Sequence, residues 1–105
     1  MTGIMVMLAT VHPARAGKTP EELMHNGSGD WVMAAWRHPV YLALVIAGLV
    51  RAVYQAGPTY AVGKRRRAFE GLRPVPPDDP VAQALLGKPH PRPGRNPVRY
   101  WTIKE

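Results

Sequence analysis

The chain contains no cysteine, and this absence excludes several kinds of site at once. Without thiols it can form no disulfide, thiolate zinc site, iron–sulfur cluster or covalent c-type haem attachment of its own. The sequence also lacks a P-loop, a dinucleotide-binding fingerprint, a catalytic triad and a pair of carboxylates placed for acid–base chemistry. We therefore predict a protein that is not an enzyme, with no metal, no cofactor and no small-molecule substrate.

Long apolar runs are absent except for one, which extends from Pro39 to Gly57. It has nineteen residues and one charge, Arg51. As a helix rising about 1.5 Å per residue it would cover roughly 28 Å, close to the hydrocarbon thickness of a bilayer. The basic cluster Lys64–Arg67 follows the run, whereas Arg37 alone lies close before it. The pattern predicts one transmembrane helix over 39–57, with the C-terminus on the matrix, cytoplasmic or stromal side.

Aromatic and basic side chains gather around both ends of this run. Aromatic rings at the two ends match the belts found at headgroup level, and a basic cluster attracts anionic lipids. The residues predicted to lie at the membrane interface are Trp31, Trp36, Tyr41, Tyr54, Tyr60, Lys64, Arg65, Arg66 and Arg67.

Small residues recur at four-residue spacing within the run, as in the pairs Ala43/Ala47 and Ala52/Ala56. Such spacing lets another helix approach closely. The single charge can reach the headgroups or pair with an acidic neighbour. The residues predicted to contact partner subunits are Ala43, Ala47, Gly48, Arg51, Ala52, Ala56, Leu85, Leu86, Tyr100 and Trp101.

The segment before the run predicts short elements. The apolar stretch Ile4–Ala9 is interpreted as an anchor that packs on a neighbouring subunit or dips into the membrane interface. Thr19, Pro20 and Glu22 form a capping box, which predicts a short helix that ends at Asn26–Gly29. A second helical stretch, 31–38, is expected to lead into the span.

The segment after the run is basic and rich in proline. It carries ten Lys/Arg against four Asp/Glu from residue 58 onward, and residues 74–97 hold eight of the twelve prolines. Each proline removes a hydrogen-bond donor and restricts the preceding residue, so a strap ordered by partners is predicted. Residues 64–72 are expected to be helical, Asp79–Gly87 to be a short capped helix, and 96–103 to be extended.

These features together predict an all-α membrane protein with a single transmembrane helix, short flanking helices and an extended Pro-rich basic tail. Its segments would be 1–38, 39–57 and 58–105. The architecture is typical of a non-catalytic accessory subunit that helps to assemble or stabilise a respiratory or photosynthetic complex. Its membrane would be the mitochondrial inner membrane, or a bacterial or thylakoid membrane. The expected partners are other subunits and anionic lipids, with no nucleic acid.

Two alternatives compete with this prediction. In a ribosomal or other RNA-associated protein, the apolar runs would be buried, and the basic tail with Tyr100 and Trp101 would contact phosphates and bases. In a pigment-binding polypeptide of a light-harvesting complex or reaction centre, His38 would be the ligand, although it lies near the end of the run and has no second ligand at helical spacing. The remaining histidines show no metal-ligand spacing.

Overall fold

The apolar run from residue 39 to residue 57 forms a β-hairpin in the computed structural model. Strand β3 covers Tyr41–Ile46 and strand β4 covers Leu49–Ala56, paired antiparallel. Between them Ala47 and Gly48 have φ angles of 53° and 82°. Two successive positive φ values are those of the tight turns that match the twist of a hairpin.

No helix in the part of the chain that the structure describes is long and apolar enough to cross a bilayer. The prediction of an all-α membrane protein with a transmembrane helix over 39–57 is therefore wrong. The single-pass location in a mitochondrial, bacterial or thylakoid membrane, with its assigned C-terminal side, is wrong for the same reason.

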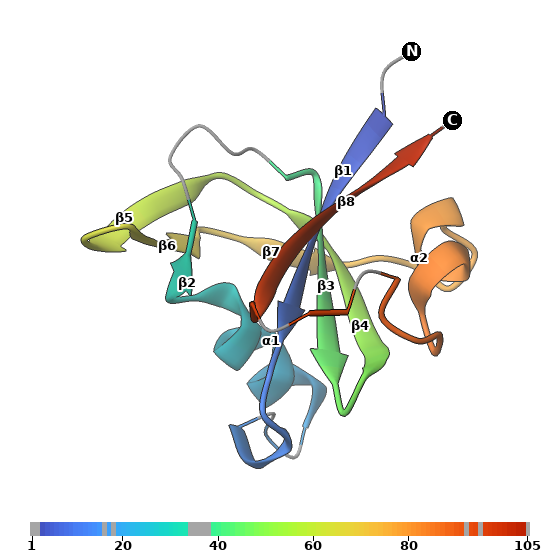
Figure 1. Ribbon diagram of the computed structural model, residues 1–105, viewed down its shortest axis with the longest axis horizontal. Coiled ribbons are helices and arrows are strands. Elements are labelled where there is room, and N and C mark those ends of the chain that lie inside the picture. Colours follow the sequence, from blue (N-terminus) through green and yellow to red (C-terminus); the bar gives the residue numbers. More distant parts are fainter. Residues whose placement is uncertain are drawn as a thin grey trace.

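The structure describes residues 3–15, 17, 19–33, 39–91, 93–94 and 96–104 (Figure 1). Among these residues the elements besides β3 and β4 are β1 (Gly3–Thr10), a 3-10 turn (Pro13–Arg15), α1 (Pro20–Ser28), β2 (Trp31–Val32), β5 (Thr59–Gly63), β6 (Arg66–Phe69), β7 (Leu72–Pro74), α2 (Pro80–Leu85) and β8 (Val98–Lys104).

The strands form two sheets. The larger has five strands in the order β7-β4-β3-β1-β8, and the smaller has three in the order β2-β6-β5. Strand β1 pairs parallel to β3 and antiparallel to β8, so that Gly3 lies opposite Lys104. The two ends of the described chain consequently lie side by side (Figure 1).

One antiparallel ribbon connects the two sheets, because β4 leads into β5 and β6 leads into β7. Both strands of the ribbon bend between the two sheets, at Gly57–Pro58 and at Glu70–Gly71, and there the Gly57 N–H donates to the Gly71 carbonyl at 2.8 Å. A Cβ on Gly57 would lie 2.9 Å from that carbonyl oxygen. The close approach of the two backbones therefore requires glycine at residue 57.

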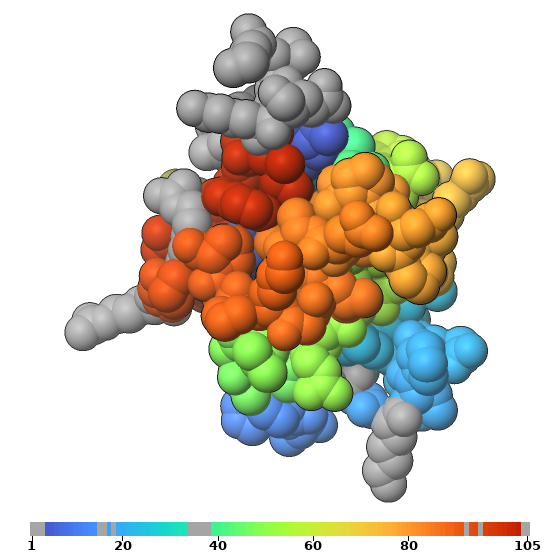
Figure 2. Space-filling view, turned by 90° about the vertical axis from the view of Figure 1, so that its right-hand side faces the viewer, coloured from blue at the N-terminus to red at the C-terminus, as the bar shows by residue number. Residues whose placement is uncertain are grey.

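Both faces of the five-stranded sheet are buried. Met7, Leu42 and Leu44 face α1 and the smaller sheet, and they pack with Phe69 and Met33. The opposite face packs against α2, as Figure 2 shows from that side; its core residues are Val6, Leu8, Ala43, Val45, Val50, Val53, Val81 and Leu85.

Burial on both faces explains the misleading apolar run. A strand covered on one face alternates apolar and polar residues, whereas a strand covered on both faces is apolar throughout. Leu42, Ala43 and Leu44 are successive residues of β3, and all three are 0% exposed. Strand β4 adds Val50, Val53 and Tyr54 to the core and exposes Arg51 and Gln55. Joined by a two-residue turn, β3 and β4 together have the length and nearly the hydropathy of a bilayer span. The stretch Ile4–Ala9, predicted to be an anchor on a neighbouring subunit or at the membrane interface, belongs instead to the interior strand β1 and is apolar for the same reason.

The predicted helix caps are confirmed. Thr19 Oγ1 accepts a hydrogen bond from the Glu22 N–H at 3.1 Å, and Asp79 Oδ1 accepts one from the Val81 N–H at 2.8 Å. Of the segment 96–103, predicted to be extended, residues 98–103 are confirmed as part of β8. Helix over 64–72 is wrong, because these residues form the turn and returning strands of the ribbon. Of the helix predicted over 31–38, Trp31–Val32 is a strand instead, and residues 34–38 lie outside the described residues.

Candidate functional site

The basic cluster Lys64–Arg67 lies at the turn of the β5–β6 hairpin. This hairpin extends away from the five-stranded sheet, on the side of the molecule opposite α2 (Figure 1). Lys64, Arg65 and Arg66 are exposed. Arg65 has a φ of 61°, in the left-handed region that favours glycine. The sequence therefore has an arginine, a cation, at a backbone position that favours glycine.

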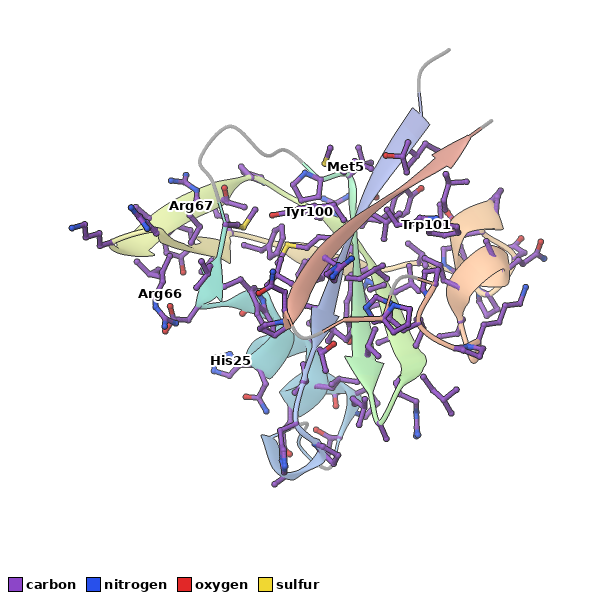
Figure 3. All side chains as sticks on the ribbon, in the orientation of Figure 1. Met5, His25, Arg66, Arg67, Tyr100 and Trp101 are labelled. Carbon is purple, nitrogen blue, oxygen red and sulfur yellow. The ribbon has the colours of Figure 1, made fainter. Side chains whose placement is uncertain are left out.

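Arg66 and Arg67 have different surroundings, because successive side chains of a strand point to opposite faces. Figure 3 shows them on opposite sides of the hairpin. The Arg67 guanidinium donates to Thr59 twice, from Nε to Oγ1 at 2.9 Å and from Nη2 to the carbonyl oxygen at 3.0 Å. Arg67 therefore connects β6 to β5, and part of the hydrogen-bonding capacity of its guanidinium is used within the domain.

Arg66 instead forms an ion pair with Asp30, two residues beyond the end of α1. Its Nη1 lies 3.6 Å from Asp30 Oδ1, and the two side chains are 51% and 64% exposed. A long, solvated pair of this kind contributes little to stability. The Arg66 guanidinium can therefore exchange Asp30 for another anion at small cost.

A large open cavity adjoins this ion pair. Its volume is about 1010 Å³. The residues that line it are Thr10, Val11, His12, Ala14, Asn26, Gly29, Asp30, Trp31, Arg66 and Pro97. The Trp31 indole is held in place, since its Nε1 donates to the Gly27 carbonyl at 2.8 Å. The His12 ring accepts the Ala14 N–H through Nδ1 at 3.1 Å, so its Nε2 carries the proton.

A second, smaller cavity lies on the other side of the segment that follows α1. It has a volume of about 410 Å³, and its walls are formed by His25, Asn26, Ser28, Gly29, Asp30, Tyr60, Val62 and Ala68. Asn26, Gly29 and Asp30 line both cavities. The two hollows are therefore neighbours, separated only by this short segment.

The structure divides the residues predicted to lie at a membrane interface between the two sheets. Trp31, Tyr60 and the cluster Lys64–Arg67 belong to the three-stranded sheet and its hairpin turn. Tyr41 and Tyr54 belong to β3 and β4 of the larger sheet, and burial raises the pKa of the Tyr54 hydroxyl above its ordinary value. Trp36 lies outside the described residues.

The residues predicted to pack against partner subunits are spread over the fold. Strands β3 and β4 contain Ala43, which is buried, Arg51, which is exposed, Ala52 and Ala56, and the turn between these strands is formed by Ala47 and Gly48. Leu85 is buried on α2, whereas Leu86 just beyond it is exposed. Tyr100 and Trp101 lie on opposite faces of β8. They form no single surface. Their places are set by the two sheets, and the four-residue spacing has no role in strands.

Sequence reasoning identified the basic cluster and Tyr60 but not the residues that surround them. Asp30, His25 and Asn26 carry no local signal of a binding site, because only the packing of α1 beside the smaller sheet brings them to the hairpin. Within the described ranges, no three His, Asp or Glu side chains are grouped to hold a metal ion.

Comparison of the chain with protein-family models, curated proteins and solved structures finds no match. The site itself therefore carries the functional inference.

Proposed function

We propose that this protein is a nucleic-acid-binding domain that holds a phosphate backbone against the turn of the β5–β6 hairpin. The observation that carries the proposal is the exposure of Lys64, Arg65 and Arg66 at the end of a projecting hairpin. The described residues give this cluster one ion pair, to Asp30. With a net charge of +7 on 105 residues, the chain has the electrostatic character of a phosphate-binding protein.

The backbone at Arg65 supports the same proposal. A non-glycine residue in the left-handed region costs about 1 kcal/mol or more, and such strain is concentrated at functional sites. A glycine there would relax the turn but would remove a cation from its tip. An arginine at this strained position is explained if its cation contacts a ligand.

The salt dependence of binding tests the proposal directly. Fluorescence anisotropy would follow the purified domain on labelled single-stranded RNA, single-stranded DNA and duplex DNA between 50 and 300 mM salt, a range in which counterion release governs affinity. We expect Lys64→Gln/Arg66→Gln to weaken binding roughly tenfold at 100 mM salt. It should also reduce the salt slope by about 0.7 for each lost phosphate contact on a single strand.

A matched control removes the same charge elsewhere. Arg51→Gln/Lys88→Gln alters two exposed cations, one near the start of β4 and one just beyond α2, both away from the hairpin turn. This variant should retain nearly all affinity. Equal losses in the two variants would show that net charge alone attracts the ligand, and absence of binding by the unaltered domain would overturn the proposal.

A gain of affinity is expected when the competing anion is removed. Asp30 has a φ of 71°, a conformation that asparagine tolerates well, so Asp30→Asn should preserve the fold. Without its carboxylate partner, Arg66 is available to phosphate, and binding should tighten severalfold. Weaker binding by this variant would show instead that Asp30 positions the Arg66 side chain for the ligand.

A further inference from the structure

We infer that Tyr60 is a stacking platform for one unpaired base, so that the ligand of this domain is single-stranded nucleic acid. This inference rests on the proposed function and adds the substrate class. Tyr60 is 49% exposed and lies near the start of β5, an edge strand of the smaller sheet. Its cross-strand partner is Ala68, a side chain too small to cover a phenol ring. The ring therefore presents apolar surface to the smaller cavity.

Tyr60 and Arg66 lie on the same face of the hairpin. Ala68 is directly opposite Tyr60, and Arg66 is two residues from Ala68 on the same strand. Residues two apart on a strand point to the same side and are separated by about 7 Å. A phosphate bound by Arg66 would therefore leave its own or an adjacent base within reach of the Tyr60 ring.

The far wall of this cavity comes from the end of α1. His25 lies there, and Figure 3 shows it on the same side of the hairpin as Arg66, whereas Arg67 lies on the opposite side. Ser28 Oγ donates to the His25 carbonyl at 2.7 Å, which tightens the last turn of the helix and fixes this wall. The hollow of about 410 Å³ lined by Tyr60 and this wall is open to solvent, so a flat group can reach the face of the ring.

The exposed ring distinguishes a single strand from a duplex. A two-stranded ribbon with basic side chains can enter the major groove of DNA, but paired and stacked bases offer no free face to Tyr60. Aromatic stacking with unpaired bases is the usual basis of single-strand recognition, and it tolerates any base because every base has a π-face. We therefore expect little dependence on sequence.

The test compares ring variants on ligands with and without bases. The ligands are a twelve-nucleotide single strand, its duplex, and a strand of equal length built from abasic sugar-phosphate units. The unaltered domain should bind the normal single strand roughly 5- to 150-fold more tightly than the abasic strand, which corresponds to the 1–3 kcal/mol that one stacked base typically contributes. Tyr60→Ala should remove this preference and leave affinity for the abasic strand unchanged.

Two further variants separate stacking from folding and from loss of apolar area. Tyr60→Phe retains the ring and should restore the preference for bases, while Tyr60→Leu retains bulk and should not. If Tyr60→Ala unfolds, the comparison of leucine with phenylalanine decides the matter. Leu86→Ala, a control, truncates an exposed apolar side chain just beyond α2, away from the cavity, and the preference should persist.

The outcomes also separate this inference from the proposed function. Equal binding of single strand, abasic strand and duplex, unaffected by Tyr60→Ala but weakened by Lys64→Gln/Arg66→Gln, would overturn the stacking inference and leave the proposed function standing. Failure of the unaltered domain to bind any of the three ligands would overturn the proposed function itself.

Discussion

At the scale of single residues, the backbone of Arg65 makes a prediction about stability and binding together. Its φ of 61° is left-handed, and glycine adopts this conformation without the Cβ clash that other residues suffer. We expect Arg65→Gly to raise the free energy of unfolding by about 0.5–1 kcal/mol while weakening nucleic-acid binding severalfold. Thermal unfolding and anisotropy titrations measure the two effects.

The neighbouring residue provides the control. Lys64 is not among the non-glycine residues with positive φ. Lys64→Gly removes the same charge but only adds flexibility to the unfolded chain, so it should lower stability by about 0.5–1 kcal/mol. If both glycine variants destabilise the domain, the turn is relaxed with arginine in place and the strain argument at Arg65 fails.

The pKa of His90 gives a second residue-scale prediction. Burial and the nearby positive charge of Arg99 lower the pKa of the His90 imidazole below 6.5. The unfolded chain then binds a proton more readily than the folded one, so this contribution to stability is complete above pH 6.5 and is lost as the pH falls toward the folded pKa. Urea unfolding of the unaltered domain and of His90→Gln between pH 5 and pH 7.5 should show a shallower pH dependence in the variant. Identical slopes would contradict the prediction.

At the scale of elements, the β3–β4 turn is open to improvement. Ala47 adopts a φ of 53° at the first central position of the turn, where asparagine is strongly preferred before glycine. Ala47→Asn should therefore stabilise the domain by about 0.5–1 kcal/mol, which corresponds to a rise in melting temperature of roughly 2–8 °C for a domain of this size. The variant Ala47→Val, β-branched and poorly tolerated at positive φ, should move the melting temperature in the opposite direction. A melting temperature unchanged by both would show that this turn does not limit stability.

The elements also show which parts of the fold were predictable from sequence. The caps at Thr19 and Asp79 depend on hydrogen bonds between residues two or three apart, so their signals are local and were read correctly. The run 39–57 was interpreted wrongly, because its apolar character comes from the layers that cover both faces of the sheet. Its β-branched and aromatic residues and the central Ala47–Gly48 pair were the available evidence for two strands.

The candidate site also has features that could be predicted from sequence and features that could not. The four successive basic residues Lys64–Arg67 can be recognised from sequence alone, and so can Tyr60, four positions before them. That Tyr60 and Arg66 share one face depends on the register of β5 with β6, which shifts by a residue between Ala61 and Gly63. That Asp30 lies beside Arg66 depends on packing between segments 36 positions apart, a relation that no local pattern encodes.

At the scale of the whole molecule, the proline-rich segment is part of the domain rather than an appendage. Residues 74–97 lead from β7 through α2, across the outer face of the larger sheet, and return the chain to β8 (Figures 1 and 2). Val81 and Leu85 supply side chains to the core on that face. The segment joins the sheet over a short stretch, where the Val50 N–H donates to the Lys88 carbonyl at 2.9 Å and Pro89 lies opposite Leu49. The prolines suit the rest of the path, because a segment that wraps a sheet needs few ladder hydrogen bonds.

The pairing of β1 with β8 determines how long β1 waits for its partner strand during synthesis. Gly3 lies opposite Lys104, so the two strands are separated by almost the entire chain. At about 5–20 residues per second, a ribosome needs roughly 5–20 s to make the hundred residues between them. During that interval β1, whose residues Val6 to Ala9 are completely buried in the finished domain, has one edge without its final partner. The nascent chain therefore passes through a period in which this apolar strand is a target for chaperones and for other unfinished copies of the chain.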